Sequence, residues 1–335
     1  MLLFFMVILL WTFFVPAISQ PGTFTRSNGA IMKQQRFSLM HDGMERTYFV
    51  HVPESYSPSA PAPLLILLHG GGGLARRMLA FTGFAPLAEK HGIVILAPAG
   101  VDRHWNDGRI KTGYRAHDDN VNDVEFIAAA IKKMESDYKI DPNRIFVTGI
   151  SNGAMMSYRL GLELPEKIAA IAPVVGSLPE PLGVQWNKTK RAINPAVPAI
   201  IFNGTDDPLV PFGGGEVHLV RKKLGTVMSV AETAQIWAAR NGCTAKPKVS
   251  SIPVSDSEMK VTKTVFGGCS NDADVVLYAI EGMGHTWPGP EPGAQYLPAR
   301  LIGRACHGLN ATELIWQFFE SHSRAAKKES LKQVD

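Results

Sequence analysis

Apolar residues along this chain gather in short, nearly unbroken runs, and segments of helical periodicity lie between the runs. The runs cover residues 64–68, 93–96, 144–148, 169–175, 199–202 and 275–280. A strand that is apolar at almost every position is buried on both faces, as in a parallel sheet covered by helices. The helical segments cover residues 78–91, 123–138, 152–164, 227–241 and 312–323. This alternation predicts an α/β fold with a mostly parallel central sheet and helices on both of its faces.

The N-terminus has a different pattern. Residues 2–15 are apolar except for Thr12, and Ala17-x-Ser19 fits the small-residue rule for signal cleavage. We predict a secretory signal peptide over residues 1–19, hence a secreted protein with no membrane association after cleavage. The alternative is an uncleaved anchor, because residues 2–18 approach the minimum length of a membrane span.

The rest of the chain reads as one folded unit. Two β-like segments at 36–40 and 46–52 flank a turn signal and predict a hairpin before the alternating region. One α/β domain of this size is common, so we predict a single catalytic domain over residues 20–324. The charged residues 325–335 are expected to be a disordered tail.

Composition excludes several kinds of site. The 335 residues carry a formal net charge of +4 without a long Lys/Arg block in the body of the chain, so no nucleic-acid partner is expected. Residues 118–123 are rich in Asp and Asn but lack EF-hand spacing, and Asp123 there predicts a helix cap beside a solvated loop. No Cys/His cluster has zinc spacing. We expect neither a metal nor a cofactor.

The segment from Gly149 to Gly153 matches G-x-S-x-G, with Ser151 at its centre. A buried strand precedes it and a helix follows it, which is the setting that this nucleophile motif requires. The turn is tight, so a side chain at either glycine would clash. It lifts the serine hydroxyl above the sheet and presents the backbone N–H of Asn152 to an oxyanion.

His69 and four glycines, 70–73, end the first core strand. Glycine lets backbone N–H groups approach a ligand closely, and in this fold the strand end supplies the second oxyanion donor. We assign that donor to Gly71, with Gly72 in reserve. A phosphate-binding loop is the rival, but its Gly-Lys-Ser/Thr ending is missing. His69 is expected to brace the loop.

Two further strand ends carry the groups that a serine nucleophile needs. Asp206 and Asp207 follow the run at 199–202, and Pro208 biases Asp207 toward an extended conformation with a defined aim. We therefore choose Asp207 over Asp206 as the acid that orients the base. His285 lies in a Gly/Pro-rich loop after the last strand and is predicted to be the base, because the order Ser–Asp–His is that of α/β-hydrolases. Trp105 and Trp287 are predicted to line the substrate pocket.

These motifs together resemble the secreted esterases grouped as polyhydroxybutyrate depolymerases, feruloyl esterases and acetylxylan esterases. The resemblance runs from about Phe37 to Phe319 and rests on the phrases at 68–72, 147–156, 204–208 and 284–289. It implies an α/β-hydrolase fold, a triad of Ser151, Asp207 and His285, and oxyanion donors at Gly71 and Asn152. It also implies a disulfide between Cys243 and Cys269, which leaves Cys306 unmatched.

The activity implied is ester hydrolysis through an acyl-enzyme. We expect a small-molecule or oligomeric ester as substrate, preferably a hydroxycinnamate (feruloyl) or short-chain ester, with weak activity on solid polymer. Polyhydroxybutyrate oligomers and acetylated xylan are the alternatives. Two rivals remain outside this class: a peptidase of the same fold, and a non-catalytic secreted binding protein on a hydrolase scaffold.

Overall fold

The computed structural model describes residues 23–27, 30–189, 195–256, 259–289 and 298–324. The predicted signal peptide and the predicted tail lie outside these residues. Within them, no helix combines the length and apolar character needed to cross a membrane.

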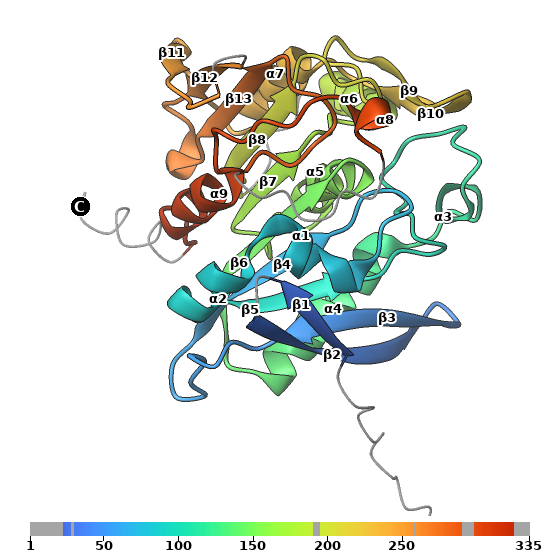
Figure 1. Cartoon of the computed structure of the whole chain (residues 1–335), viewed down its shortest axis with the longest axis vertical. Helices are drawn as coiled ribbons and strands as arrows, with labels where there is room; N and C mark the ends of the chain where they lie inside the picture. The colour runs from blue at the N-terminus through green and yellow to red at the C-terminus, as the bar shows by residue number, and fades with distance from the viewer. Residues whose placement is uncertain (1–22, 28–29, 190–194, 257–258, 290–297, 325–335) are drawn as a thin grey trace, which may run out of the picture.

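A large mixed sheet forms the centre of the molecule (Figure 1). In chain order its strands are β1 (Thr23–Ser27), β2 (Ala30–His41), β3 (Met44–His51), β4 (Ala62–Leu68), β5 (Val94–Pro98), β6 (Ile140–Ile150), β7 (Ala170–Val174), β8 (Ala199–Gly204), β11 (Lys248–Ile252), β12 (Lys260–Phe266) and β13 (Val275–Glu281). Their order across the sheet is β1-β2-β3-β5-β4-β6-β7-β8-β13-β12-β11. The strands from β5 to β13 in this order run parallel, and antiparallel strands flank them at both edges.

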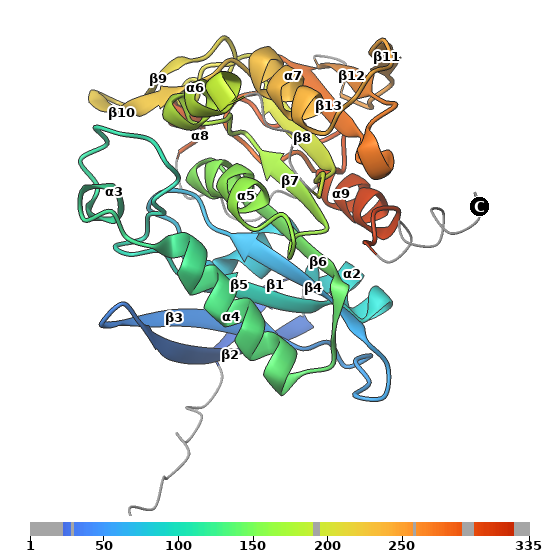
Figure 2. The same cartoon turned by 180° about the vertical axis from the view of Figure 1, so that it is seen from behind.

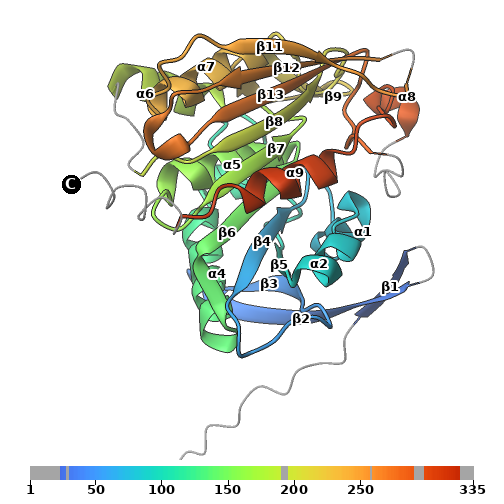
Figure 3. The same ribbon diagram turned by 90° about the vertical axis from the view of Figure 1, so that its left-hand side faces the viewer.

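Helices cover both faces of the sheet, as Figures 2 and 3 show. Alternate residues of β4 point to opposite sides: Leu64, Ile66 and Leu68 pack into one apolar cluster, and Leu65 and Leu67 into the other. The first cluster includes residues of α4 (Asp123–Asp137), α5 (Asn152–Glu163) and α7 (Val230–Arg240). The second includes residues of α1 (Met78–Thr82), α2 (Ala85–His91) and α9 (Ala311–Glu320). The predicted α/β-hydrolase architecture, with a doubly covered parallel centre, is confirmed.

Several boundaries differ from those predicted. The single helix expected over 78–91 is divided into α1 and α2 because Gly83 adopts a left-handed conformation, φ 72°, which ends α1. A two-stranded hairpin of β9 (Gly215–Leu219) and β10 (Lys222–Val227) was not predicted. The remaining short helices are α3 (Arg115–Asp118), α6 (Glu180–Thr189) and α8 (Ala299–Ile302).

The cysteines are arranged as the family resemblance implies. Cys243, which follows α7, forms a disulfide with Cys269, which precedes β13. Cys306 is buried and free. The bond closes the segment that contains the antiparallel strands β11 and β12 at the sheet edge.

Candidate active site

Ser151 lies at the sharp junction between β6 and α5. Its φ of 58° and ψ of −119° are rarely adopted by a residue with a side chain. Its N–H donates to the carbonyl of Val174 at 3.0 Å, which holds the turn against β7. A non-glycine residue in such a conformation persists only where its surroundings impose it, as at many active sites.

The two glycines of the motif allow this turn to pack against β4. A Cβ on Gly153 would lie 2.4 Å from the carbonyl oxygen of Leu68, and one on Gly149 would lie 2.7 Å from backbone atoms of Gly153. No side chain fits at such distances, so the predicted steric role of both glycines is confirmed. The serine therefore sits at the carboxyl ends of the central strands.

Asp207 and His285 form a buried pair. The Nδ1 of His285 lies 2.7 Å from Oδ2 of Asp207, and the other carboxylate oxygen accepts hydrogen bonds from the N–H groups of Leu209 and Val210 at 2.8 and 2.9 Å. In the neutral ring, a proton on Nδ1 is donated to this carboxylate and Nε2 keeps its lone pair. Asp206, in contrast, is exposed and contacts Thr205.

The loops that carry this pair approach each other through their backbones. A Cβ on Gly204 would lie 2.1 Å from the carbonyl oxygen of Met283, and one on Gly284 would lie 2.1 Å from that of Ile302. Glycine at 204 therefore lets the loop with His285 lie directly on the end of β8, and glycine at 284 lets the same loop pack against the end of α8. These contacts fix the loop whose histidine lines the same pocket as Ser151.

One pocket brings together four of the five predicted catalytic and oxyanion residues, and the fifth, Asp207, contacts His285. Ser151, His285, Gly71 and Asn152 line it together. Its remaining wall is largely apolar, formed by Phe81, Ile150, Leu209, Val210, Val217, Leu219, Leu224 and Ile302. His104 and Tyr114 add a stacked pair, with ring centroids 3.6 Å apart and planes 18° apart. Gly70, Arg109, His218 and Thr286 also line the pocket.

Two backbone N–H groups of the glycine loop are already bonded within the protein. The N–H of Gly72 donates to the carbonyl of Arg103 at 2.9 Å, and the N–H of Gly73 donates to Gly70 at 2.9 Å. Gly71 lies beside Asn152, since a Cβ on it would be 3.8 Å from that of Asn152. The geometry therefore favours Gly71 over Gly72 as the second oxyanion donor. The first donor is the N–H of Asn152, which lies in the first turn of α5 and has no partner within the helix.

His69 braces this loop. It is buried, its Nε2 accepts from the N–H of Gly100 at 3.0 Å, and its Nδ1 lies 2.9 Å from the carbonyl of Gly70. Nδ1 must therefore carry the proton and donate it. Burial lowers the pKa of His69 to about 4, so the ring is neutral at physiological pH.

Trp105 and Trp287 do not line the pocket, and their prediction as substrate-binding residues is wrong. Both are fully buried. The indole N–H of Trp105 donates to the carbonyl of His69 at 2.9 Å, and that of Trp287 donates to Thr312 at 2.9 Å. Trp287 also meets Phe81 edge-on. A buried indole needs an acceptor, and neither acceptor residue lines the pocket.

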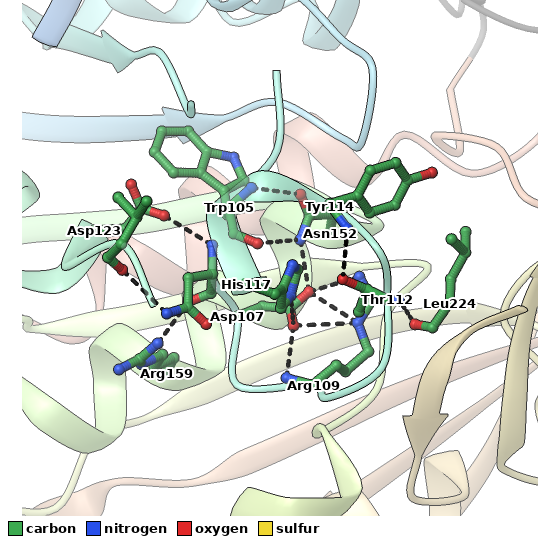
Figure 4. Close-up of polar contacts among 12 residues, drawn as sticks. Trp105, Asp107, Arg109, Thr112, Tyr114, His117, Asp123, Asn152, Arg159 and Leu224 are labelled. Atoms are coloured by element: carbon green, nitrogen blue, oxygen red, sulfur yellow. Dashed lines mark hydrogen bonds and ion pairs between the residues drawn. The ribbon is translucent and has the colours of Figure 1, made fainter. Parts of the chain in front are cut away.

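A buried polar network next to Asn152 was also missed from the sequence. Figure 4 shows the carboxylate of Asp107 in contact with the amide of Asn152, and the side chains of Arg109 and His117 in contact with the same carboxylate. The same figure shows Asp123, which accepts from the N–H of Asn106 at 2.7 Å.

The prediction that Asp123 caps α4 is wrong. The capping side chain is that of Asn122, which accepts from the N–H of Glu125 at 3.3 Å. Asp123 is instead buried against Arg46, whose guanidinium lies 2.5 Å from its carboxylate. The carboxylate is therefore an internal tether and not a surface cap.

Comparisons with known proteins show the family and the fold of this chain. A family model described as phospholipase/carboxylesterase matches residues 54–233. The chain is 30% identical to a putative esterase NocK of Nocardia uniformis subsp. tsuyamanensis over 74% of this chain and 72% of that protein. It is 31% identical to feruloyl esterase B of Piromyces equi over 72% of this chain, but the match spans only 42% of that protein. Its fold resembles that of an acetyl xylan esterase from Aspergillus awamori, with a TM-score of 0.53 at 17% identity over 75% of this chain and 93% of that one.

The two adjacent aspartates provide a matched test of the His285 partner. We predict that Asp207→Asn lowers kcat on a chromogenic ester by about 10⁴-fold, because the amide no longer fixes the histidine tautomer. Asp206→Asn, at an exposed carboxylate with no contact to the histidine, should cost far less. Steady-state kinetics of both variants would contradict the assignment if the larger loss fell on Asp206.

His69 makes the fold sensitive to acid. In the unfolded chain a histidine titrates near pH 6.5, whereas the folded pKa is about 4. Between these values the unfolded chain binds more protons, so the free energy of unfolding should fall by about 3 kcal/mol as the pH drops from about 7 to 4. His69→Gln cannot titrate and should show a smaller pH dependence in urea unfolding. Equal slopes in the two proteins would refute this role.

Proposed function

This chain belongs to the phospholipase/carboxylesterase family and is a carboxylic ester hydrolase of the α/β-hydrolase fold, and on that premise we propose that it is a serine esterase. Ser151 is the nucleophile, His285 the general base and Asp207 the carboxylate that orients it. The observation that carries the proposal is the buried contact of 2.7 Å between His285 Nδ1 and Asp207 Oδ2, at a pocket that Ser151 also lines.

The reaction proceeds through an acyl-enzyme. Nε2 of His285 takes the hydroxyl proton of Ser151 as the serine oxygen attacks the ester carbonyl. The N–H groups of Gly71 and Asn152 stabilise the resulting oxyanion. His285 then gives its proton to the departing alcohol, and a water molecule, activated by the same histidine, releases the acid and restores the serine. No metal or cofactor takes part in these steps.

The character of the pocket supports an apolar acyl group. Aliphatic side chains such as Leu209, Val217 and Leu224 form much of its wall, and Phe81 adds an aromatic edge. The stacked rings of His104 and Tyr114 provide a flat surface for an aromatic acid. We therefore propose hydroxycinnamate or short-chain esters as substrates, in line with the feruloyl esterases among the relatives.

We further propose that the protein is secreted. The apolar N-terminal segment with its cleavage signal at Ser19 supports a signal peptide over residues 1–19. The disulfide between Cys243 and Cys269 is compatible with an oxidising compartment. The catalytic domain is then residues 20–324.

The nucleophile can be tested directly. We predict that Ser151→Ala keeps the fold and lowers ester hydrolysis by several orders of magnitude, because no other group supplies the attacking oxygen. A serine-directed phosphonate should label the wild-type protein at Ser151 alone, as read by peptide mass spectrometry. Labelling elsewhere, or near-full activity in the alanine variant, would sink the serine mechanism.

The substrate class needs one purified preparation and a panel of substrates. We predict the highest kcat/KM on methyl hydroxycinnamates or short acyl esters, because these match the apolar and aromatic wall. The panel adds acetylated xylan, a hydroxybutyrate trimer and a small peptide amide. Preference for the trimer or the xylan would overturn the acyl preference and leave the triad intact, whereas cleavage of the amide alone would overturn the esterase assignment.

A further inference from the structure

The side chain of Asn152 does not face the substrate. Its Oδ1 accepts from the backbone N–H of Trp105 at 2.8 Å, and its Nδ2 donates to the carbonyl of Trp105 at 3.0 Å and to Asp107 Oδ2 at 2.6 Å. Every hydrogen-bonding site of the amide except one acceptor lone pair is therefore occupied within the protein. The side-chain amide of Asn152 is therefore engaged within the protein, and the donor that this residue offers to an oxyanion is its backbone N–H.

Asp107 is the centre of these contacts. It is fully buried and accepts from the backbone N–H, Nε and Nη2 of Arg109, at 2.8 to 3.1 Å, and its Oδ1 lies 3.0 Å from Nε2 of His117. Burial alone would raise the pKa of this carboxyl, but Arg109 and His117 outweigh it and hold the pKa well below its usual range. The group is thus a fixed negative charge.

The same centre is connected to the wall of the pocket through Arg109. Nη1 of Arg109 donates to the carbonyl of Leu224 in β10 at 2.7 Å. Arg109 and Leu224 both line the pocket, as does Tyr114, in the loop between Arg109 and His117. Figure 4 shows how these contacts converge beside Asn152.

We propose that Asp107 is a positioning residue for the oxyanion donor: by holding the amide of Asn152, it sets the direction in which the backbone N–H of that residue points. This inference rests on the proposed serine esterase function. The carboxylate touches neither the nucleophile nor the substrate pocket and acts through Asn152. Displacements of about 1 Å at such donors cost on the order of 10²-fold in rate.

Asp123 provides a matched control. It is also a fully buried carboxylate paired with an arginine, and it tethers the same loop through the N–H of Asn106. It makes no contact with Asn152 among the interactions of the described residues. If Asp107 served only to anchor the loop, loss of either carboxylate would have the same consequence.

The experiment compares Asp107→Asn with Asp123→Asn. Each oxygen of Asp107 accepts from an N–H group of Arg109, so the introduced NH₂ group must face a donor wherever it points. We expect kcat on a methyl ester to fall about 10²-fold in Asp107→Asn with little change in KM, the pattern for an interaction used only in the transition state. Asp123→Asn should lower Tm but leave kcat close to that of the wild type. Equal losses of kcat in the two variants, or none in Asp107→Asn, would overturn the proposal.

A double-mutant cycle tests whether the effect passes through Asn152. Asn152→Ala removes the amide that Asp107 holds. We expect Asp107→Asn to lower kcat about 10²-fold in the wild-type background but less than about tenfold in the Asn152→Ala background, a non-additivity typical of residues in direct contact. Equal losses in both backgrounds, in variants that are folded by circular dichroism, would refute the link. Failure of the proposed function would be seen separately, as a wild-type protein that hydrolyses no ester and is not labelled at Ser151.

Discussion

The close approach of backbone to backbone at the end of β6 is the constraint on which the site depends. Gly153 lies so near the carbonyl of Leu68 that a Cβ would be 2.4 Å from it, and this contact packs the first turn of α5 onto the end of β4. Ser151 is consequently held at φ 58°, a conformation that the surrounding sheet must impose. The same contact puts Gly71 beside Asn152, so that the hydroxyl of Ser151 and the two proposed backbone donors line one pocket.

Two buried carboxylates orient the polar side chains that lie around this junction. Asp207 holds the ring of His285, and Asp107 holds the amide of Asn152. Each has its remaining acceptor capacity occupied, Asp207 by backbone N–H groups of its own turn and Asp107 by Arg109 and His117. A buried charge that was left without partners would be costly. Both carboxylates therefore act as fixed acceptors that select one orientation of a neighbouring polar side chain.

The sequence predicted the parts of this arrangement that follow from local pattern. Unbroken apolar runs predicted the parallel strands, and the glycines around Ser151 predicted the turn, because both effects act between near neighbours in the chain. The network of Asp107 could not be found in this way, because its contacts join distant parts of the chain. Asp107 and Asn152 are 45 residues apart in sequence, and Arg109 and Leu224 are 115 residues apart. The β9–β10 hairpin was missed because its strands mix charged, glycine and apolar residues without clean alternation.

The two tryptophans illustrate a different limit. Trp287 is two residues from His285 in sequence, yet its indole turns away from the pocket toward Thr312, because adjacent loop residues point in different directions and a buried N–H needs an acceptor. The ring surface facing the pocket comes instead from His104 and Tyr114, in a loop that is tied to Asn152 and to β10 by the charge of Asp107. The chemistry and the shape of the acyl pocket are therefore mechanically linked: a change that moves this loop to admit another acid would also disturb the donor that stabilises the oxyanion.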